Sequence, residues 1–236
     1  MQTTQIKICG LTTAPTMNAA LDAGADMIGL MSFPKSPRHV DLDSMAGLAD
    51  QARGRSQIVV VTVDANNALL DAINKAVRPD IWQLHGKEDA TRIHAVRARY
   101  GRPVMKALGV AGPEDVAAAN AMAEVADRVL LDAKPPKDAS RPGGLGKSFD
   151  WSLLDGLADD LRNPHHGFLL SGGLNPANVA DAIKATYAPG VDVSSGVESA
   201  PGKKDEALIR AFIEAVQDLR LERQPATDAQ PIRTTA

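Results

Sequence analysis

Apolar residues fall into two alternating patterns along this chain. Short runs dominated by β-branched and other apolar residues, of which 57–63 is the clearest, predict buried strands. Longer alanine-rich stretches with apolar residues at helical spacing lie between them and predict helices. The strands are predicted at 5–9, 27–33, 57–63, 81–84, 104–108, 128–132, 167–170 and 191–193. The helices are predicted at 15–23, 41–53, 66–77, 89–100, 113–124, from about 151, from 175 and from about 204 to 221.

The strict alternation of these elements restricts the fold. Strands that alternate with helices pair in parallel, and their crossovers are right-handed. Eight such units in a chain of 236 residues predict an α/β protein with a closed (β/α)8 TIM barrel, and an open doubly wound sheet is the alternative. No linker or change of composition divides the chain, so residues 1–222 are expected to form one domain. Residues 223–236 are polar and lack periodicity, which predicts a loose tail.

Composition and charge exclude several classes of protein. A formal net charge of −3 and an aromatic content of 3% give no basis for nucleic-acid binding. The single cysteine, Cys9, allows no internal disulfide and fits the reducing cytoplasm. No apolar run resembles a signal peptide or approaches the roughly 20 residues of a membrane span. We therefore expect a cytoplasmic protein without membrane or nucleic-acid partners, either a monomer or a homodimer.

Two successive strands near the end of the chain are followed by similar glycine turns. The first turn covers 171–173 and precedes Asn175 and Pro176, which suit a helix start; the second covers 194–196. Glycines let backbone N–H groups close on a ligand, and (β/α)8 barrels recurrently bind phosphate after their seventh and eighth strands. Read singly, each turn is an ordinary strand-to-helix connection. As a pair they predict a phosphate site formed by the backbone of Gly172, Gly173, Ser195 and Gly196.

The alternation of side chains along a strand selects the other candidate residues. Function in such barrels collects at the carboxyl ends of the strands, where alternate side chains point into the lumen. If the β-branched residues face the helices, Lys7 and Cys9 point inward on the first strand. His85 directly follows the fourth strand and also points inward. Asp132 and Asp192 point inward on the sixth and eighth. A thiol, an imidazole and carboxylates therefore converge on one opening.

Each of these residues also has a plainer interpretation. Cys9 is a candidate buried small apolar side chain, Asp132 a candidate turn cap, and His85 a hydrogen-bonded loop residue. No His, Cys and Asp spacing resembles a metal site, and no GxGxxG follows the first strand. We therefore expect neither a metal nor a cofactor.

Two loops add further candidates. The loop at 33–38 contains two prolines and ends in Arg38, whose guanidinium can grip a planar carboxylate or can simply be a solvated surface group. The loop at 133–148 exceeds the usual two to six residues of a βα connection and is rich in glycine. It is either a lid or an ordinary insertion.

The motifs taken together resemble the phosphoribosylanthranilate isomerase family of tryptophan biosynthesis. The matching motifs, in chain order, are KICGLT (7–12), FPKSPR (33–38), QLHG (83–86), LLDAK (130–134), GGLGKSFDW (143–151), LSGGLNPANV (170–179) and DVSSGVE (192–198). The resemblance implies a ribulose-phosphate-binding barrel that needs no cofactor. It also implies a phosphosugar substrate, N-(5-phosphoribosyl)anthranilate, converted by an Amadori rearrangement to 1-(2-carboxyphenylamino)-1-deoxyribulose 5-phosphate.

The same resemblance implies roles for the residues selected above. Cys9 matches the general base that removes the C2 proton, and Asp132 matches the general acid that opens the furanose ring. Arg38 matches the residue that holds the anthranilate carboxylate, and the two glycine turns match the phosphate site. His85 and Asp192 are implied to lie in the active site without an assigned step. One departure is Leu145, which stands where the family usually has a hydroxyl residue in the lid.

Two other functions compete with this one. A related histidine-pathway isomerase or an indole-glycerol-phosphate synthase would be expected to place paired aspartates, or a lysine and a glutamate, at the strand ends. A non-catalytic sugar-phosphate-binding barrel would be expected to lack Cys9 or Asp132, yet both are present. The motifs leave open whether the chain accepts a second substrate.

Overall fold

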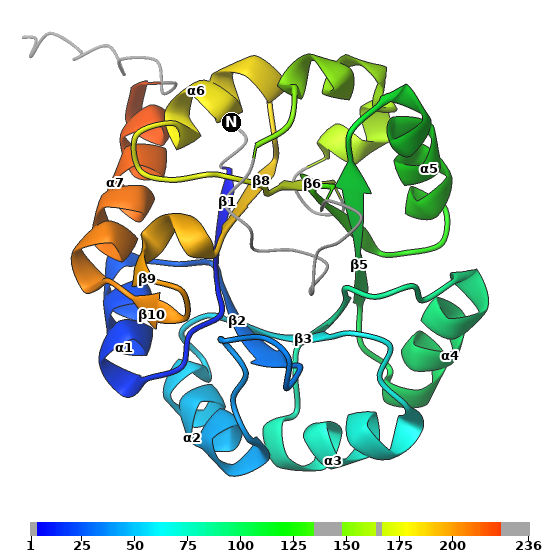
Figure 1. Cartoon of the computed structure of the whole chain (residues 1–236), viewed down its shortest axis with the longest axis vertical. Helices are drawn as coiled ribbons and strands as arrows, with labels where there is room; N and C mark the ends of the chain where they lie inside the picture. Colours follow the sequence, from blue (N-terminus) through cyan, green and yellow to red (C-terminus); the bar gives the residue numbers. More distant parts are fainter. Residues whose placement is uncertain (1–3, 135–147, 164–166, 223–236) are drawn as a thin grey trace, which may run out of the picture.

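Eight parallel strands close into a ring in a computed structural model that describes residues 4–134, 148–163 and 167–222 (Figure 1). Each strand pairs with the next along the chain, and the last pairs with the first. The predicted (β/α)8 barrel is therefore confirmed, and the alternative of an open sheet is excluded. The strands are β1 (Gln5–Cys9), β2 (Met27–Ser32), β3 (Gln57–Thr62), β4 (Ile81–Leu84), β5 (Val104–Val110), β6 (Arg128–Ala133), β7 (Leu169–Leu170) and β8 (Gly190–Val193).

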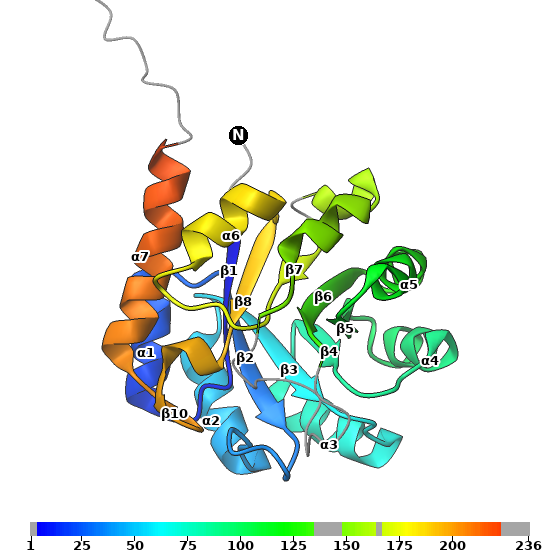
Figure 2. The ribbon, with the colours of Figure 1, turned by 45° about the horizontal axis from the view of Figure 1, so that its top comes forward.

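Helices surround this ring, and α1 packs beside α7 where the ends of the barrel meet (Figure 2). Four of them begin at side-chain caps, because Asp41, Asn66, Asp89 and Asp205 each accept a hydrogen bond from the N–H three residues later. The helices are α1 (Ala14–Ala23), α2 (Leu42–Ala52), α3 (Asn67–Val77), α4 (Ala90–Tyr100), α5 (Pro113–Ala123), α6 (Val179–Thr186) and α7 (Glu206–Glu222). In the described part of the chain no helix is long and apolar enough to cross a bilayer.

The prediction of eight α-helices was wrong for the sixth unit. The segment after β6 folds into two 3₁₀ helices, η1 (Trp151–Gly156) and η2 (Asp159–Arg162); Gly156, a residue that disfavours a helix interior, ends the first of them. After β8 the chain forms η3 (Ser195–Val197) and a hairpin of β9 (Glu198–Ala200) and β10 (Lys203–Lys204) before α7 begins. Residues 223–236, predicted to be a tail, lie outside the described residues.

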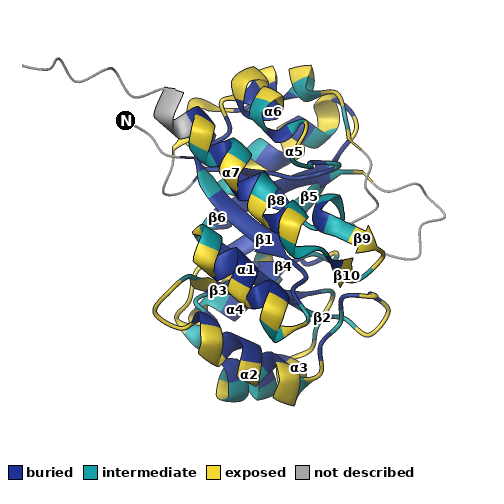
Figure 3. Ribbon diagram, turned by 90° about the vertical axis from the view of Figure 1, so that its left-hand side faces the viewer, coloured by how far each residue is buried: buried dark blue, intermediate teal, exposed yellow. Residues whose placement is uncertain are grey.

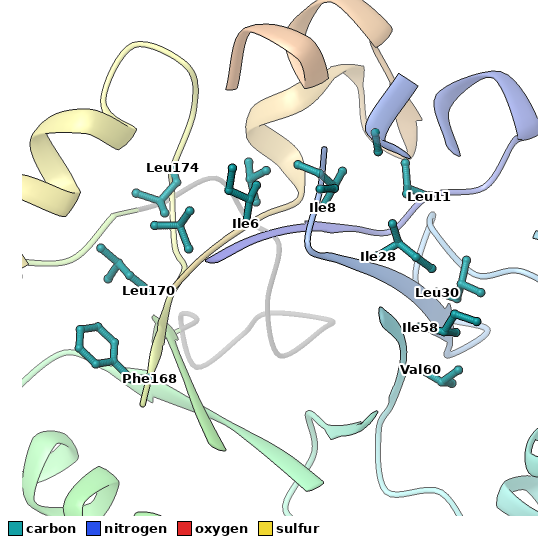
Figure 4. Close-up of a cluster of buried hydrophobic side chains, with 14 of the residues drawn as sticks. Ile6, Ile8, Leu11, Ile28, Leu30, Ile58, Val60, Phe168, Leu170 and Leu174 are labelled. Atoms are coloured by element: carbon teal, nitrogen blue, oxygen red, sulfur yellow. The ribbon is translucent and has the colours of Figure 1, made fainter. Parts of the chain in front are cut away.

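The core has two layers, separated by the ring of strands. An outer cluster fills the space between strands and helices, and Figure 4 shows Ile6, Ile8 and other members of it projecting from the ring. An inner cluster fills the lumen from the first four positions of six strands; it consists of Met27, Val59, Ile81, Met105, Ala107, Leu130 and Leu169. Figure 3 shows the buried strands behind helices whose exposed residues face outward. The inner cluster thus leaves the carboxyl ends of the strands for polar side chains.

Candidate active site

Cys9 lies at the carboxyl end of β1, where its residue is only 5% exposed. Its neighbour on β2 is Gly29, and a Cβ at that position would lie 2.8 Å from Cys9 Sγ and 3.1 Å from Lys7 Nζ. The absence of a side chain at Gly29 therefore makes room for the thiol and the ammonium side by side.

Opposing effects act on the pKa of this thiol. Burial raises the pKa of Cys9, the positive charge of Lys7 lowers it, and the negative charge of Asp192 raises it again. Burial outweighs the effect of Lys7, so the pKa of the thiol is above its ordinary value. The thiolate is consequently scarcer at neutral pH than that of an exposed cysteine, and it is also more basic.

Lys7 and Asp192 form a buried ion pair inside the barrel. Lys7 Nζ lies 2.6 Å from Asp192 Oδ1, and Ser171 Oγ donates to the other carboxylate oxygen at 3.0 Å. Burial acts to lower the pKa of Lys7, but the charges of Asp192 and Cys9 and the hydrogen bonds to them together outweigh it, so the pKa is raised. The paired ammonium stays charged beside Cys9.

Asp132 occupies the equivalent position at the carboxyl end of β6 and is 7% exposed. Its Oδ2 lies 3.8 Å from Nε2 of His85, and its Oδ1 accepts a hydrogen bond from the N–H of Ala133 at 2.8 Å. Burial lowers the pKa of His85 to about 4, and the charge of Lys106 acts in the same direction. His85 is therefore neutral at physiological pH.

The orientation of His85 is set by Gln83, two residues earlier on β4. The amide nitrogen of Gln83 lies 3.2 Å from Nδ1 of the ring. An amide nitrogen only donates, so Nδ1 accepts and the ring proton resides on Nε2, which faces Asp132. The charges of Asp192 and Lys7 act on both His85 and Cys9, so all four groups share the same lumen.

The two glycine turns pack directly against each other. Gly172 and Gly173 adopt φ angles of 88° and 65°, which side chains disfavour. A Cβ at Gly196 would overlap the carbonyl oxygen of Leu174. Among the described residues, several N–H groups of the two turns make no hydrogen bond to another residue. They include those of Gly172, Gly173, Ser195 and Gly196. Four donors at one end of the barrel suit an anion.

The helix predicted to start at Asn175 and Pro176 begins later, and this part of the prediction was wrong. Helix α6 starts at Val179, and Pro176 lies in the turn before it. The side chain of Asn178 accepts from the N–H of Asn175 at 2.8 Å and donates to the carbonyl oxygen of Gly173 at 3.1 Å. These bonds stabilise a turn in place of a first helical turn.

Arg38 ends the loop after β2 and is 3% exposed, so it is no solvated surface group. Its Nε and Nη2 bind the two carboxylate oxygens of Glu198 at 2.6 and 2.9 Å. Sequence reasoning missed this partner, although Glu198 ends one of the quoted motifs, and it also missed the buried Lys204 beside it. The long loop predicted as a lid, with Leu145, lies mostly outside the described residues.

No group of three or more metal-ligating side chains occurs among the residues that the structure describes. The arrangement is instead one of titratable side chains at a single rim of the barrel: Cys9, Lys7, His85, Asp132 and Asp192. It can exchange protons with a ligand whose anionic group rests on the glycine turns.

Comparisons with known proteins agree with this geometry. A family described as N-(5'phosphoribosyl)anthranilate (PRA) isomerase matches residues 6–215. The N-(5'-phosphoribosyl)anthranilate isomerase of Rhodopseudomonas palustris (strain CGA009) is 55% identical over 214 residues, covering 91% of this chain and 98% of the relative.

Two solved structures share the fold over nearly their whole length. The phosphoribosyl anthranilate isomerase of Thermotoga maritima has a TM-score of 0.78 at 33% identity, covering 91% of this chain and 99% of its own. A second isomerase was solved in complex with reduced 1-(o-carboxyphenylamino)-1-deoxyribulose 5-phosphate. It has a TM-score of 0.75 at 30% identity, with the same coverage of both chains.

Proposed function

Because this chain belongs to the N-(5'-phosphoribosyl)anthranilate isomerase family and is thus an intramolecular isomerase of tryptophan biosynthesis, we propose that Cys9 and Asp132 are its base and acid. One observation supports this pair above others. Both side chains lie buried at the carboxyl ends of lumen-facing strands, with the charges of Lys7 and Asp192 in the same space. A rival barrel that lacks a thiol at this position could not use the same chemistry.

The proposed reaction begins at the furanose ring. Asp132 donates a proton to the ring oxygen while the C1–O bond breaks, and the nitrogen lone pair forms a C1=N bond. The positive nitrogen acidifies the proton on C2, which Cys9 removes as thiolate. The electron pair left on C2 forms a C1=C2 bond and neutralises the nitrogen. Protonation of C1 and loss of the C2 hydroxyl proton then give the ketone, so the conversion is a net isomerisation.

The surrounding residues support this sequence of steps. The basic thiolate that burial produces favours proton removal from carbon, and the Lys7 ammonium limits how scarce that thiolate becomes. Neutral His85, with its Nε2 proton toward Asp132, positions the acid without adding a second charge. The N–H groups of Gly172, Gly173, Ser195 and Gly196 are proposed to bind the phosphate, and Arg38 the anthranilate carboxylate. We expect a monomer or a homodimer, and a solved phosphoribosylanthranilate isomerase of Thermotoga maritima is described as dimeric.

Rescue of a tryptophan-requiring bacterial strain that lacks only this isomerase tests the proposal. The wild-type gene should restore growth, whereas Cys9→Ala and Asp132→Asn should not. In the purified variants kcat should fall by about 10²–10⁴-fold, since positioned acids and bases contribute about that much. The melting temperature should barely change.

An exposed aspartate on α6 provides the matched control. Asp181→Asn removes the same charge from the surface and should leave both growth and kcat at the wild-type level. Near-normal turnover in Cys9→Ala or Asp132→Asn would eliminate the corresponding role.

A further inference from the structure

Glu198 joins parts of the site that are far apart in the sequence. It begins β9, Arg38 comes from the loop after β2, and Lys204 ends β10. Its two oxygens bind Arg38 in a fork, and Lys204 Nζ binds Oε1 at 2.7 Å. The three side chains are at most 3% exposed. A single carboxylate is therefore held between two buried cations.

The backbone around this cluster permits the close approach. Gly10 has a φ of 76°, and a Cβ there would lie 2.6 Å from Cδ of Arg38. Gly202 donates its N–H to Glu198 Oε2 at 3.1 Å, and a Cβ at Gly202 would lie 2.5 Å from the carbonyl oxygen of Pro37. Two glycines in the left-handed region thus bring the β9–β10 hairpin against the Arg38 loop.

The cluster also reaches the second glycine turn. Lys204 Nζ lies 2.8 Å from the carbonyl oxygen of Ser194 and 3.3 Å from its hydroxyl. Ser194 immediately precedes Ser195 and Gly196, the residues proposed for phosphate binding. Although burial acts to raise it, the cations Arg38 and Lys204 hold the pKa of Glu198 below its ordinary value, so its carboxylate stays charged.

We propose that Glu198 is a positioning residue that sets the placement of both anion sites. Through Arg38 it orients the guanidinium toward the carboxylate end of the substrate, and through Lys204 it fixes the turn that receives the phosphate end. The inference rests on the proposed carboxylate role of Arg38. It explains why a negative charge is buried in a site that must bind two anionic groups.

Charge and position make opposite predictions for Glu198, which allows a sharp test. If the residue acted only through its charge, removing that charge would strengthen binding of an anionic substrate. If it positions Arg38 and the turn, removing it weakens binding because the donors lose their alignment. The sign of the change in KM therefore separates the two explanations.

The first variant is Glu198→Gln, which keeps the shape but replaces one acceptor with a donor. KM should rise about 10-fold, equivalent to about 1.4 kcal/mol, while kcat changes much less. The inhibition constant of anthranilate, used as a probe of the Arg38 end, should rise as well. In an Arg38→Ala background, Glu198→Gln should cause no further change in that constant, because its effect on this end passes through Arg38.

Glu198→Asp is a second variant that keeps the inference testable if Glu198→Gln does not fold. It retains the charge, but its shorter side chain cannot span the same distance. It should also raise KM, by less than Glu198→Gln. Glu206→Gln, which alters an exposed ion pair with Arg210 on α7, is the matched control and should leave KM unchanged. An unchanged or lower KM in both Glu198 variants, with KM raised in Arg38→Ala, overturns the inference alone. An unchanged KM in Arg38→Ala overturns the proposed role of Arg38 and this inference with it.

Discussion

Buried ion pairs dominate the site at the scale of single residues. Lys7 with Asp192 and Arg38 with Glu198 each lie within 2.6 Å of their partner oxygen. Burying charges costs several kcal/mol per ion, so such pairs contribute little net stability. Their value lies in holding fixed charges where a substrate and its transition state develop charge. The first pair flanks the thiol, and Glu198 of the second directly follows η3, which contains Ser195 and Gly196.

His85 contributes to the pH dependence of the stability of the protein. Its pKa of about 4 in the folded protein lies below the ordinary 6.5. Between these two pH values the unfolded chain therefore binds a proton at His85 that the folded chain does not bind. The contribution of His85 to stability is thus complete above pH 6.5 and declines as the pH falls toward 4, by up to about 3 kcal/mol. In His85→Gln this part of the decline should disappear from urea unfolding curves.

The exposed His94 on α4 supplies the comparison. His94→Gln should retain the full wild-type decline between these two pH values. If His85→Gln and His94→Gln showed the same pH dependence, the neutral state of His85 beside Asp132 would be contradicted.

At the scale of elements, the two glycine turns work as one unit. Gly196 touches the carbonyl oxygen of Leu174, so the turn after β8 rests on the turn after β7. Lys204 and Asn178 then tie each turn to the segment that follows it. The geometry of the proposed phosphate site depends on these packed connections, and the regular helix start predicted at Asn175 is not needed for it.

Gly196→Ala tests this contact between elements. The new methyl group must displace the Leu174 backbone, which should cost about 1–3 kcal/mol of stability and move the N–H donors apart. We expect a higher KM with a smaller change in kcat, measured by steady-state kinetics and thermal unfolding.

Gly47→Ala on α2 is a suitable control, since a Cβ there meets no atom within 4 Å. It should stabilise the protein by about 0.4–1 kcal/mol and leave KM unaltered. A KM for Gly196→Ala equal to that of wild type would show that the contact between the turns does not shape the phosphate site.

At the scale of the whole molecule, the two layers of the core divide stability from function. The inner cluster fills the lumen at the first four positions of the strands, and the polar residues lie at the carboxyl ends. Leu130 belongs to that cluster and lies two residues before Asp132 on β6, on the same inward side. The packed inner cluster thus lies directly beneath the site and supports its residues.

Leu130→Ala should therefore reduce the free energy of unfolding by about 2–5 kcal/mol through the cavity it creates. KM should change little, because the substrate is proposed to bind above the cluster. Leu69→Ala, at a position 39% exposed on α3, should change stability by no more than about 0.5 kcal/mol. Equal losses in the two variants, measured by denaturant unfolding, would contradict the assignment of Leu130 to the core.

Much of this architecture follows from local sequence. The alternation of side chains correctly placed Ile6 and Ile8 against the helices and Lys7 in the lumen, because strand periodicity depends only on neighbouring residues. Helix starts at Asp41, Asn66 and Asp89 are also local, since each cap bonds a residue three positions away. The ordered motifs indicated the family, which the comparisons confirm.

Contacts that depend on closure of the barrel were decided only by the tertiary structure. Arg38 and Glu198 are 160 positions apart, and Lys7 and Asp192 are 185 apart. They meet because β8 pairs with β1 and because the β9–β10 hairpin packs against the loop after β2. The sequence alone therefore determined which side chains face the lumen. Only the closed ring decided which of them are partners, since charge pairing depends on distance in space.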